Sequence, residues 1–222
     1  MDWKGASGYV EVEIQGGTAV LGREEVQPAP FAAVVLCGGG SRRMGTDKAL
    51  VTHNGVRLVD RVYGRLRSVA DPVFFAPGRE GRLGALPGDE VGDALGDRGP
   101  LGGVVAALER SPHEILAVVA VDMPWCSASL FTAAASLWQG EDAVVPVDKS
   151  GQQVLHALYS RAVLPRFRDA LNEDRLSLRT LLGDLKVLYL DESVWAQADP
   201  SGRFALNLNR PEDLALLAEF SE

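Results

Sequence analysis

The chain has 222 residues, a formal net charge of −8 at pH 7 and a sequence pI of about 5.0. This acidic balance argues against general nucleic-acid binding, and no apolar run approaches the roughly 18 residues that a membrane-spanning helix needs. Two cysteines, Cys37 and Cys126, stand in unrelated contexts, so the sequence indicates neither a disulfide framework nor a zinc site, and a reducing cytoplasmic compartment is expected.

Residues 1–30 differ from the rest of the chain. The stretch YVEVEIQGGTAVLG alternates apolar and polar residues around two glycines, which is a weak hairpin signal, and QPAPF then resembles a linker. We expect an N-terminal appendage here, either a hairpin or partly disordered. Residues 31–222 are expected to form one domain.

From Phe31 onward, strand and helix patterns alternate. Such alternation predicts a three-layer, Rossmann-like α/β fold, with a mainly parallel sheet covered by helices on both faces. Continuous apolar runs predict buried strands, whereas apolar residues at helical spacing predict helices. The expected strands are 31–37, 71–76, 114–124, 142–147, 153–159 and 186–191, and the expected helices are 58–70, 100–110, 127–138, 161–171, 176–185 and 211–220.

The segment CGGGSRRMGTDK follows the first of these strands directly. Glycines allow backbone N–H groups to approach an anion closely, and Arg42, Arg43 and Lys48 add positive charge. The combination predicts a polyphosphate cradle. The simpler alternative is a tight strand-to-helix turn with solvated arginines.

Two common nucleotide motifs do not fit this segment. A P-loop requires lysine directly after the second glycine, but Lys48 comes two positions late. The dinucleotide fingerprint requires a third glycine where Arg43 stands. A nicotinamide oxidoreductase is therefore disfavoured, and a different kind of nucleotide loop is indicated.

Asp122 follows the most hydrophobic strand, LAVVAV. A carboxylate at the end of a buried strand needs a cation or hydrogen-bond donors, and ligands in open α/β sheets sit beyond the carboxyl ends of the strands. We therefore expect Asp122 to bind Mg²⁺ beside the substrate phosphates. The alternative is a helix N-cap ahead of Pro124.

The motif LCGGGSRRMGTDKAL resembles the signature of the molybdenum cofactor guanylyltransferases. Further segments resemble other blocks of that family in the same order, and the likeness covers about residues 31–220. These segments are GPLGGVVAAL (99–108), VVAVDMPW (118–125), HALYSRAVLPRFRDAL (156–171) and NLNRPEDL (207–214).

This resemblance implies transfer of GMP from GTP to the terminal phosphate of molybdenum-carrying molybdopterin, with release of pyrophosphate. The nucleophile is already an anion, so positioning and electrostatic stabilisation carry the catalysis. GTP and molybdopterin are the implied substrates, and molybdoenzymes or cofactor-insertion proteins are the implied partners.

The resemblance also implies roles for individual residues. Lys48 would contact the α- or β-phosphate, Arg43 the leaving pyrophosphate, and Asp122 the metal ion, while the role of Arg42 stays open. Asn207 and Asn209 would serve the pterin side, unless they only form the turn before the last helix. The implied nucleotide-binding residues are Leu36, Cys37, Gly38, Gly39, Arg43, Lys48, Asp93 and Asp122.

Several positions differ from the family pattern or have a structural explanation. Cys37 replaces the family's usual alanine, and we interpret it as a packing residue. Ala76 stands where the family often carries an asparagine near the nucleotide sugar, which affects base or sugar recognition and not the reaction type. His156 is interpreted as a strand residue. Gly99, Gly102 and Gly103 either let the following helix approach the substrate or allow tight helix packing.

Two alternatives to the guanylyltransferase function remain open at this level. The glycine loop does not separate guanine from cytosine, so a cytidylyltransferase or another transferase acting on a phosphorylated small molecule fits as well. A nucleotide-binding regulator without turnover is the alternative from a different class.

Overall fold

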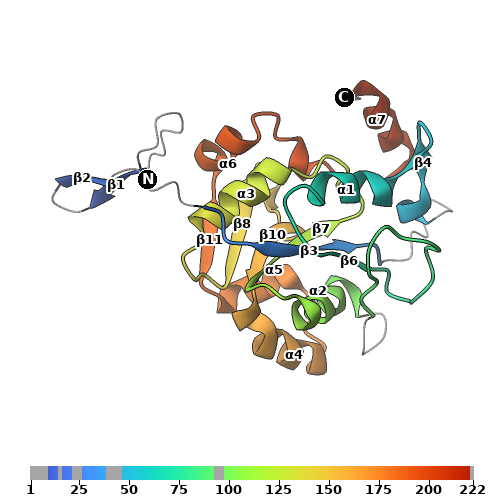
Figure 1. The fold of residues 1–222 in the computed structure, drawn as a ribbon, viewed down its shortest axis with the longest axis horizontal. Coiled ribbons are helices and arrows are strands. Elements are labelled where there is room, and N and C mark those ends of the chain that lie inside the picture. Colours follow the sequence, from blue (N-terminus) through green and yellow to red (C-terminus); the bar gives the residue numbers. More distant parts are fainter. Residues whose placement is uncertain (1–9, 15–16, 22–26, 39–46, 93–97, 221–222) are drawn as a thin grey trace.

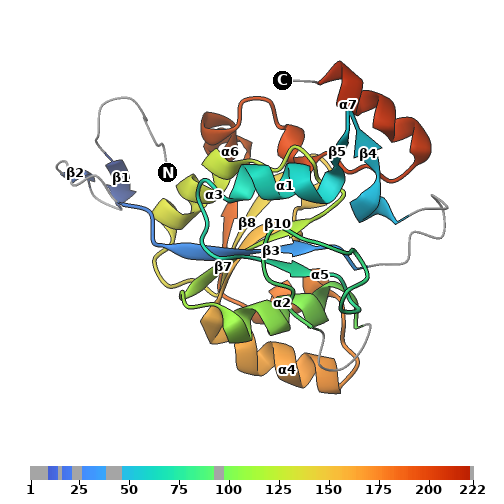
Figure 2. The same cartoon turned by 45° about the vertical axis from the view of Figure 1, so that its right-hand side comes forward.

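The computed structural model describes residues 10–14, 17–21, 27–38, 47–92 and 98–220. Within these residues a central sheet lies between two layers of helices (Figures 1 and 2). None of the helices that they form has the length and apolar character needed to cross a bilayer.

The main sheet contains seven strands in the described part of the chain, in the order β11-β8-β10-β7-β3-β6, with β9 paired to β8. At its centre β3 runs parallel to both β6 and β7, while β10 runs antiparallel to its two neighbours. The strands are β3 (Phe31–Leu36), β6 (Val73–Ala76), β7 (Ile115–Ala120), β8 (Ala143–Asp148), β9 (Gly151–Gln152), β10 (His156–Ser160) and β11 (Val187–Leu190).

Strand β3 shows why helices cover both faces. Its six residues are all buried, and successive side chains point to opposite faces. Ala33 and Val35 pack with the helices on one side, whereas Val34 and Leu36 pack with those on the other. This continuous burial confirms the predicted three-layer α/β fold.

The first helical layer contains α1 and α3, with α6 beside α3, and the second contains α2, α4 and α5 (Figure 2). Apolar spacing and caps set these helices: Ser127 accepts a hydrogen bond from the Leu130 N–H at the start of α3. The helices are α1 (Leu58–Leu66), α2 (Gly99–Arg110), α3 (Ala128–Leu137), α4 (Leu164–Asn172), α5 (Leu178–Leu181), α6 (Glu192–Ala198) and α7 (Ala215–Glu219).

Shorter elements complete the fold. Strands β1 (Val10–Ile14) and β2 (Gly17–Leu21) pair antiparallel in a separate two-stranded sheet within the N-terminal segment. A second small hairpin consists of β4 (Thr52–His53) and β5 (Val56–Arg57). The 3₁₀ helices are η1 (Lys48–Leu50), η2 (Arg161–Val163), η3 (Leu182–Asp184), η4 (Arg203–Ala205) and η5 (Pro211–Leu214).

Some element boundaries differ from the sequence-based expectation. The last helix was expected as one unit over 211–220, but it begins as 3₁₀ helix η5 and continues as α7. The strand expected at 153–159 begins only at His156, as β10, and β9 (Gly151–Gln152) precedes the expected range. Helix α6 was not expected, although Asp191 caps it by accepting from the Ser193 and Val194 N–H groups.

Candidate active site

The glycine-rich segment begins where β3 ends. Leu36 and Cys37 are buried, and the Cys37 N–H donates to the Ala76 carbonyl at 3.0 Å, which prolongs the pairing of β3 with β6. Burial raises the pKa of the Cys37 thiol to about 12, so the thiol stays protonated at neutral pH. Its buried side chain agrees with a packing role. The predicted ligands Gly39, Arg43 and Asp93, together with Arg42, lie outside the described residues.

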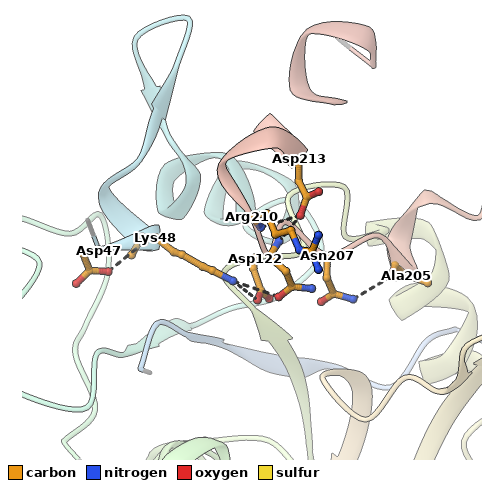
Figure 3. Close-up of polar contacts among 9 residues, drawn as sticks. Asp47, Lys48, Asp122, Ala205, Asn207, Arg210 and Asp213 are labelled. Carbon is orange, nitrogen blue, oxygen red and sulfur yellow. Dashed lines mark hydrogen bonds and ion pairs between the residues drawn. The ribbon is translucent and has the colours of Figure 1, made fainter. Parts of the chain in front are cut away.

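Lys48 is the first residue of a short 3₁₀ helix that has an N-cap. Asp47 precedes 3₁₀ helix η1, and its Oδ1 accepts a hydrogen bond from the Ala49 N–H at 3.1 Å. This is the N-cap arrangement that short acidic side chains favour, because they satisfy N–H groups left free in the first turn. From there the Lys48 side chain extends to Asp122 (Figure 3).

Lys48, Asp122 and Asn209 come together although they are far apart in the chain. The Lys48 Nζ donates to Asp122 Oδ2 at 3.2 Å and to Asn209 Oδ1 at 3.3 Å. The side chains of Lys48 and Asp122 are 19% and 23% exposed, so the pair is partly shielded yet open to a ligand. Lys48 and Asp122 thus meet at one edge of the sheet, near the carboxyl ends of β3 and β7.

The segment with the two asparagines is fastened beside Asp122. The Leu208 N–H donates to the Asp122 carbonyl at 2.8 Å, and the Leu208 side chain is buried. Asn207 and Asn209, on either side of it, are exposed. Only Asn209 contacts Lys48, whereas the Asn207 amide donates to the Ala205 carbonyl at 3.0 Å (Figure 3).

Asp213 holds the backbone of this segment. Its Oδ2 accepts from the Asn209 N–H at 2.7 Å and from the Arg210 N–H at 2.8 Å. These hydrogen bonds from Arg210 and Asn209 lower the pKa of the Asp213 carboxyl, because they favour its charged form. The carboxylate therefore fixes the loop from which the Asn209 amide reaches Lys48.

A shallow pocket lies between the carboxyl ends of β3 and β6 and the start of α2. Leu36, Gly38, Ala76, Gly99 and Gly103 contribute to its lining. A Cβ atom at Gly103 would lie 2.8 Å from both the Ala76 Cβ and the Leu36 Cδ2. Tight packing of α2 on the sheet therefore accounts for Gly103, and Ala76 faces this contact at the end of β6.

His156 has a structural environment. It begins β10, is fully buried and stacks on Phe131 with ring centroids 4.2 Å apart. Its Nε2 accepts from the Ser127 N–H at 3.0 Å, and burial lowers its pKa to about 3. The ring is therefore neutral at physiological pH, and the expectation that His156 is a strand residue is confirmed.

Sequence reasoning missed three side chains that organise the site: Asp47, Asp213 and Arg82. Asp47 could have been found as an acidic residue ahead of a helix start, and Asp213 as one in the first turn of the closing helix. Arg82 carries no local signal, yet it pairs with Asp47 and donates to the Cys37 carbonyl.

The oxygen atoms at Lys48 suit a divalent cation. One carboxylate oxygen and one amide oxygen already converge on the Lys48 ammonium, and both are hard donors of the kind that Mg²⁺ takes. The described residues contain no group of three or more His, Cys, Asp or Glu side chains placed to hold a metal ion. If Asp122 binds Mg²⁺, as the sequence predicts, substrate oxygens and water must supply most of the other ligands.

The fold, the glycine segment and the Lys48–Asp122 pair at the carboxyl edge of the sheet define a nucleotidyltransferase. The family model of the MobA-like NTP transferase domain matches residues 33–188. A "Probable molybdenum cofactor guanylyltransferase" of Methanosarcina acetivorans is 31% identical over 87% of this chain and 93% of its own length. The protein of the same name from Pelotomaculum thermopropionicum is 32% identical over 82% of this chain and 88% of its own length.

The chain belongs to the molybdenum cofactor guanylyltransferase family, within the MobA-like NTP transferases. Its resemblance to that family, first indicated by the motifs, is confirmed.

Solved structures agree on the fold. Molybdopterin-guanine dinucleotide biosynthesis protein A from Archaeoglobus fulgidus has a TM-score of 0.75 at 23% identity, over 85% of this chain and 97% of that one. The 2-C-methyl-D-erythritol 4-phosphate cytidylyltransferase from Thermus thermophilus has a TM-score of 0.59 at 18% identity, over 84% of this chain and 96% of that one. The expected nucleotidyltransferase fold is therefore confirmed.

Proposed function

We propose that this chain transfers GMP from GTP to the terminal phosphate of molybdenum-carrying molybdopterin, releasing pyrophosphate and forming the guanine dinucleotide cofactor. The observation that carries the proposal is the convergence of Lys48, Asp122 and Asn209 beyond the carboxyl ends of β3 and β7. A cation, a carboxylate and an amide therefore meet where open α/β sheets bind their substrates, which supports the proposal. The family of the chain supplies the identity of those substrates.

The chemistry requires no general base from the protein. A phosphate oxygen of the acceptor forms a bond to the α-phosphorus of GTP, and the bond from that phosphorus to the oxygen of the leaving pyrophosphate breaks. Because the attacking oxygen is already anionic, the enzyme must bring two anions together and stabilise charge on the α-phosphoryl group. The buried, neutral His156 has no part in this.

Lys48 is the described residue best placed for that task. Its ammonium, now shared by Asp122 and Asn209, would donate to the α- or β-phosphate when GTP is bound. Asn209, which touches the same ammonium, would place the acceptor near the reacting phosphorus, with Asn207 beside it. Leu36, Cys37, Gly38 and Gly39 would line the nucleotide site, Asp93 would contact the nucleotide, and Arg43 would stabilise pyrophosphate.

Asp122 would hold Mg²⁺. When bound, this ion would neutralise phosphate charge and orient the triphosphate for in-line attack. Asp122 already accepts from Lys48, so the same carboxylate that orients the ammonium would also bind the metal ion. In this arrangement the protein supplies few ligands of its own, as is usual for Mg²⁺ bound beside nucleotide phosphates.

The reaction would take place in the cytoplasm. Both cysteines are free and buried, which suits a reducing compartment. Molybdoenzymes and the proteins that insert the finished cofactor would be the partners that receive its product.

A thermal shift comparison of GTP, CTP, ATP and UTP, each with and without Mg²⁺, tests the proposal. At 100 times its Kd a ligand adds about 2.7 kcal/mol of stability, which corresponds to a shift in Tm of roughly 5–11 °C for a chain of this size. A GTP-selective shift followed by pyrophosphate release with molybdopterin is expected. A CTP-selective shift would favour cytidylyl transfer, which related folds perform.

A further inference from the structure

Arg82 connects three segments that surround the start of the active site. It lies in the loop that follows β6, outside every motif that the sequence analysis singled out. Its Nε donates to the Pro77 carbonyl at 2.9 Å, and its Nη2 donates to the Cys37 carbonyl at 2.5 Å. Its Nη1 pairs with Asp47 Oδ2. One guanidinium thus joins the end of β3, the loop after β6 and the residue that precedes Lys48.

This ion pair differs from an ordinary surface pair. The side chains of Arg82 and Asp47 are 22% and 20% exposed, so solvent and salt screen their attraction only in part. A planar guanidinium can also donate hydrogen bonds to several acceptors in fixed directions. A lysine ammonium lacks this fixed geometry. The loop that presents Arg82 is itself held, because the Gly81 N–H donates to Glu90 Oε2 at 2.9 Å.

Asp47 transmits this restraint to Lys48. One carboxylate oxygen of Asp47 pairs with Arg82, while the other caps η1 through the Ala49 N–H. The guanidinium therefore fixes the side chain that defines the first turn of η1. Lysine has a long flexible stem, so its ammonium reaches Asp122 reproducibly only if its backbone is held in place.

Cys37 connects Arg82 to the strand next to Asp122. It follows β3, which pairs directly with β7, and the Val121 N–H donates to the Leu36 carbonyl at 3.1 Å just before Asp122. By bonding to the Cys37 carbonyl, Arg82 ties η1 to the same strand that positions Asp122. Arg82 is thus bonded both to the residue before Lys48 and to the end of the strand that pairs with β7.

We propose that Arg82 is a positioning residue for phosphoryl transfer, which acts through Asp47 to hold Lys48 at the reacting phosphates. The inference rests on the proposed function, since it assigns Lys48 to the chemistry. It predicts that loss of Arg82 impairs the chemical step more than nucleotide binding.

The test compares Arg82→Met and Arg82→Lys with a control, Arg166→Met. Arg166 also pairs with an aspartate, Asp142, at 2.9 Å, but it is 56% exposed and projects from α4. We expect Arg82→Met to lower kcat for GTP-dependent pyrophosphate release with molybdopterin about 10- to 100-fold, as misplacement of a catalytic group does. The Kd for GTP should stay within about threefold of wild type. Arg82→Lys should recover part of the rate, and Arg166→Met should match wild type.

A double variant separates positioning from general destabilisation. If Arg82 acts through Lys48, Arg82→Met should reduce kcat less than about twofold in a Lys48→Met background, because the group that it positions is gone. An equal loss of rate in both backgrounds would mean that Arg82 supports the fold as a whole, and it would overturn the inference.

Amide hydrogen exchange gives a readout that requires no turnover. The Ala49 N–H is protected by Asp47, so Arg82→Met should accelerate its exchange about tenfold or more, whereas Arg166→Met should leave it unchanged. Unchanged Ala49 exchange, or wild-type kcat in Arg82→Met, would overturn the role of Arg82 and leave the proposed function intact. If the wild-type protein releases no pyrophosphate, the proposed function is overturned. The positioning of Lys48 for this reaction is then overturned as well, regardless of the exchange data.

Discussion

The Lys48 ammonium lies 3.2 Å from the Asp122 carboxylate, although the two residues are 74 positions apart in the chain. They meet because β3 and β7 are parallel neighbours whose carboxyl ends lie at the same edge of the sheet. The two side chains are 19% and 23% exposed, and Lys48 begins η1 whereas Asp122 lies two residues beyond the end of β7. The pair is therefore partly shielded from solvent and still accessible to a ligand.

Replacement of Lys48 by alanine should slow the reaction far more than it weakens the fold. Loss of one donor to a developing phosphoryl charge typically costs about 100- to 1000-fold in rate, or about 2.7–4 kcal/mol. We expect this loss in kcat for pyrophosphate release, with Tm changed by a few degrees at most, because such an ion pair contributes about 1 kcal/mol or less to stability. Lys149→Ala, which removes the same charge in the turn between β8 and β9, is the matched control.

Asp122→Ala should abolish Mg²⁺-dependent turnover while metal-free GTP binding survives. Titration calorimetry with and without Mg²⁺ would measure this difference. Near-normal Mg²⁺-dependent rates in the variant would show that the metal ion is held elsewhere.

The buried His156 makes stability depend on pH. Its pKa is about 3 in the folded chain, against about 6.5 in an unfolded one, so between these values the unfolded state binds the additional proton. The free energy of unfolding should therefore rise as pH increases from 3 to 6.5, by up to about 1.4 kcal/mol per pH unit from this residue. This contribution is complete above 6.5.

Urea unfolding at several pH values would measure this slope. His156→Gln keeps an acceptor for the Ser127 N–H and should flatten the slope, although loss of stacking on Phe131 lowers overall stability. His113→Gln, in the loop before β7, should leave the slope in place. An unchanged slope in His156→Gln would assign the pH dependence to other groups.

Gly103→Ala should destabilise the fold and narrow the pocket. The added methyl group would meet Ala76 and Leu36 at 2.8 Å, so α2 must move away from the sheet. Overpacking of this kind typically costs about 1–3 kcal/mol. Gly64→Ala is the control, because no atom lies within 4 Å of a Cβ at that position of α1, and it should stabilise by roughly 0.5–1 kcal/mol. Equal unfolding midpoints for both variants would contradict the close packing.

Much of the fold follows from local patterns. The apolar runs of β3 and β7 and the helical spacing in α1 are visible without any tertiary information, because burial on one or both faces imposes a period on the sequence. The position of Asp122 at the end of a buried strand follows in the same way. Helix α6 was missed because its pattern is short and only Trp195 is buried within it.

The glycine-rich segment, the strand–helix alternation and the acidic residue after LAVVAV are properties of the sequence by itself. They determined the class of fold, and they predict a nucleotide as the ligand. The tertiary structure alone decided that β10 runs antiparallel between β7 and β8, that Asn209 reaches Lys48 and Asn207 does not, and that Arg82 joins Cys37 to Asp47. The periodicity of apolar residues indicates which side chains are buried, and it can be recognised within a short stretch of sequence. Contacts between residues tens of positions apart depend instead on how whole elements pack, and no local pattern records that.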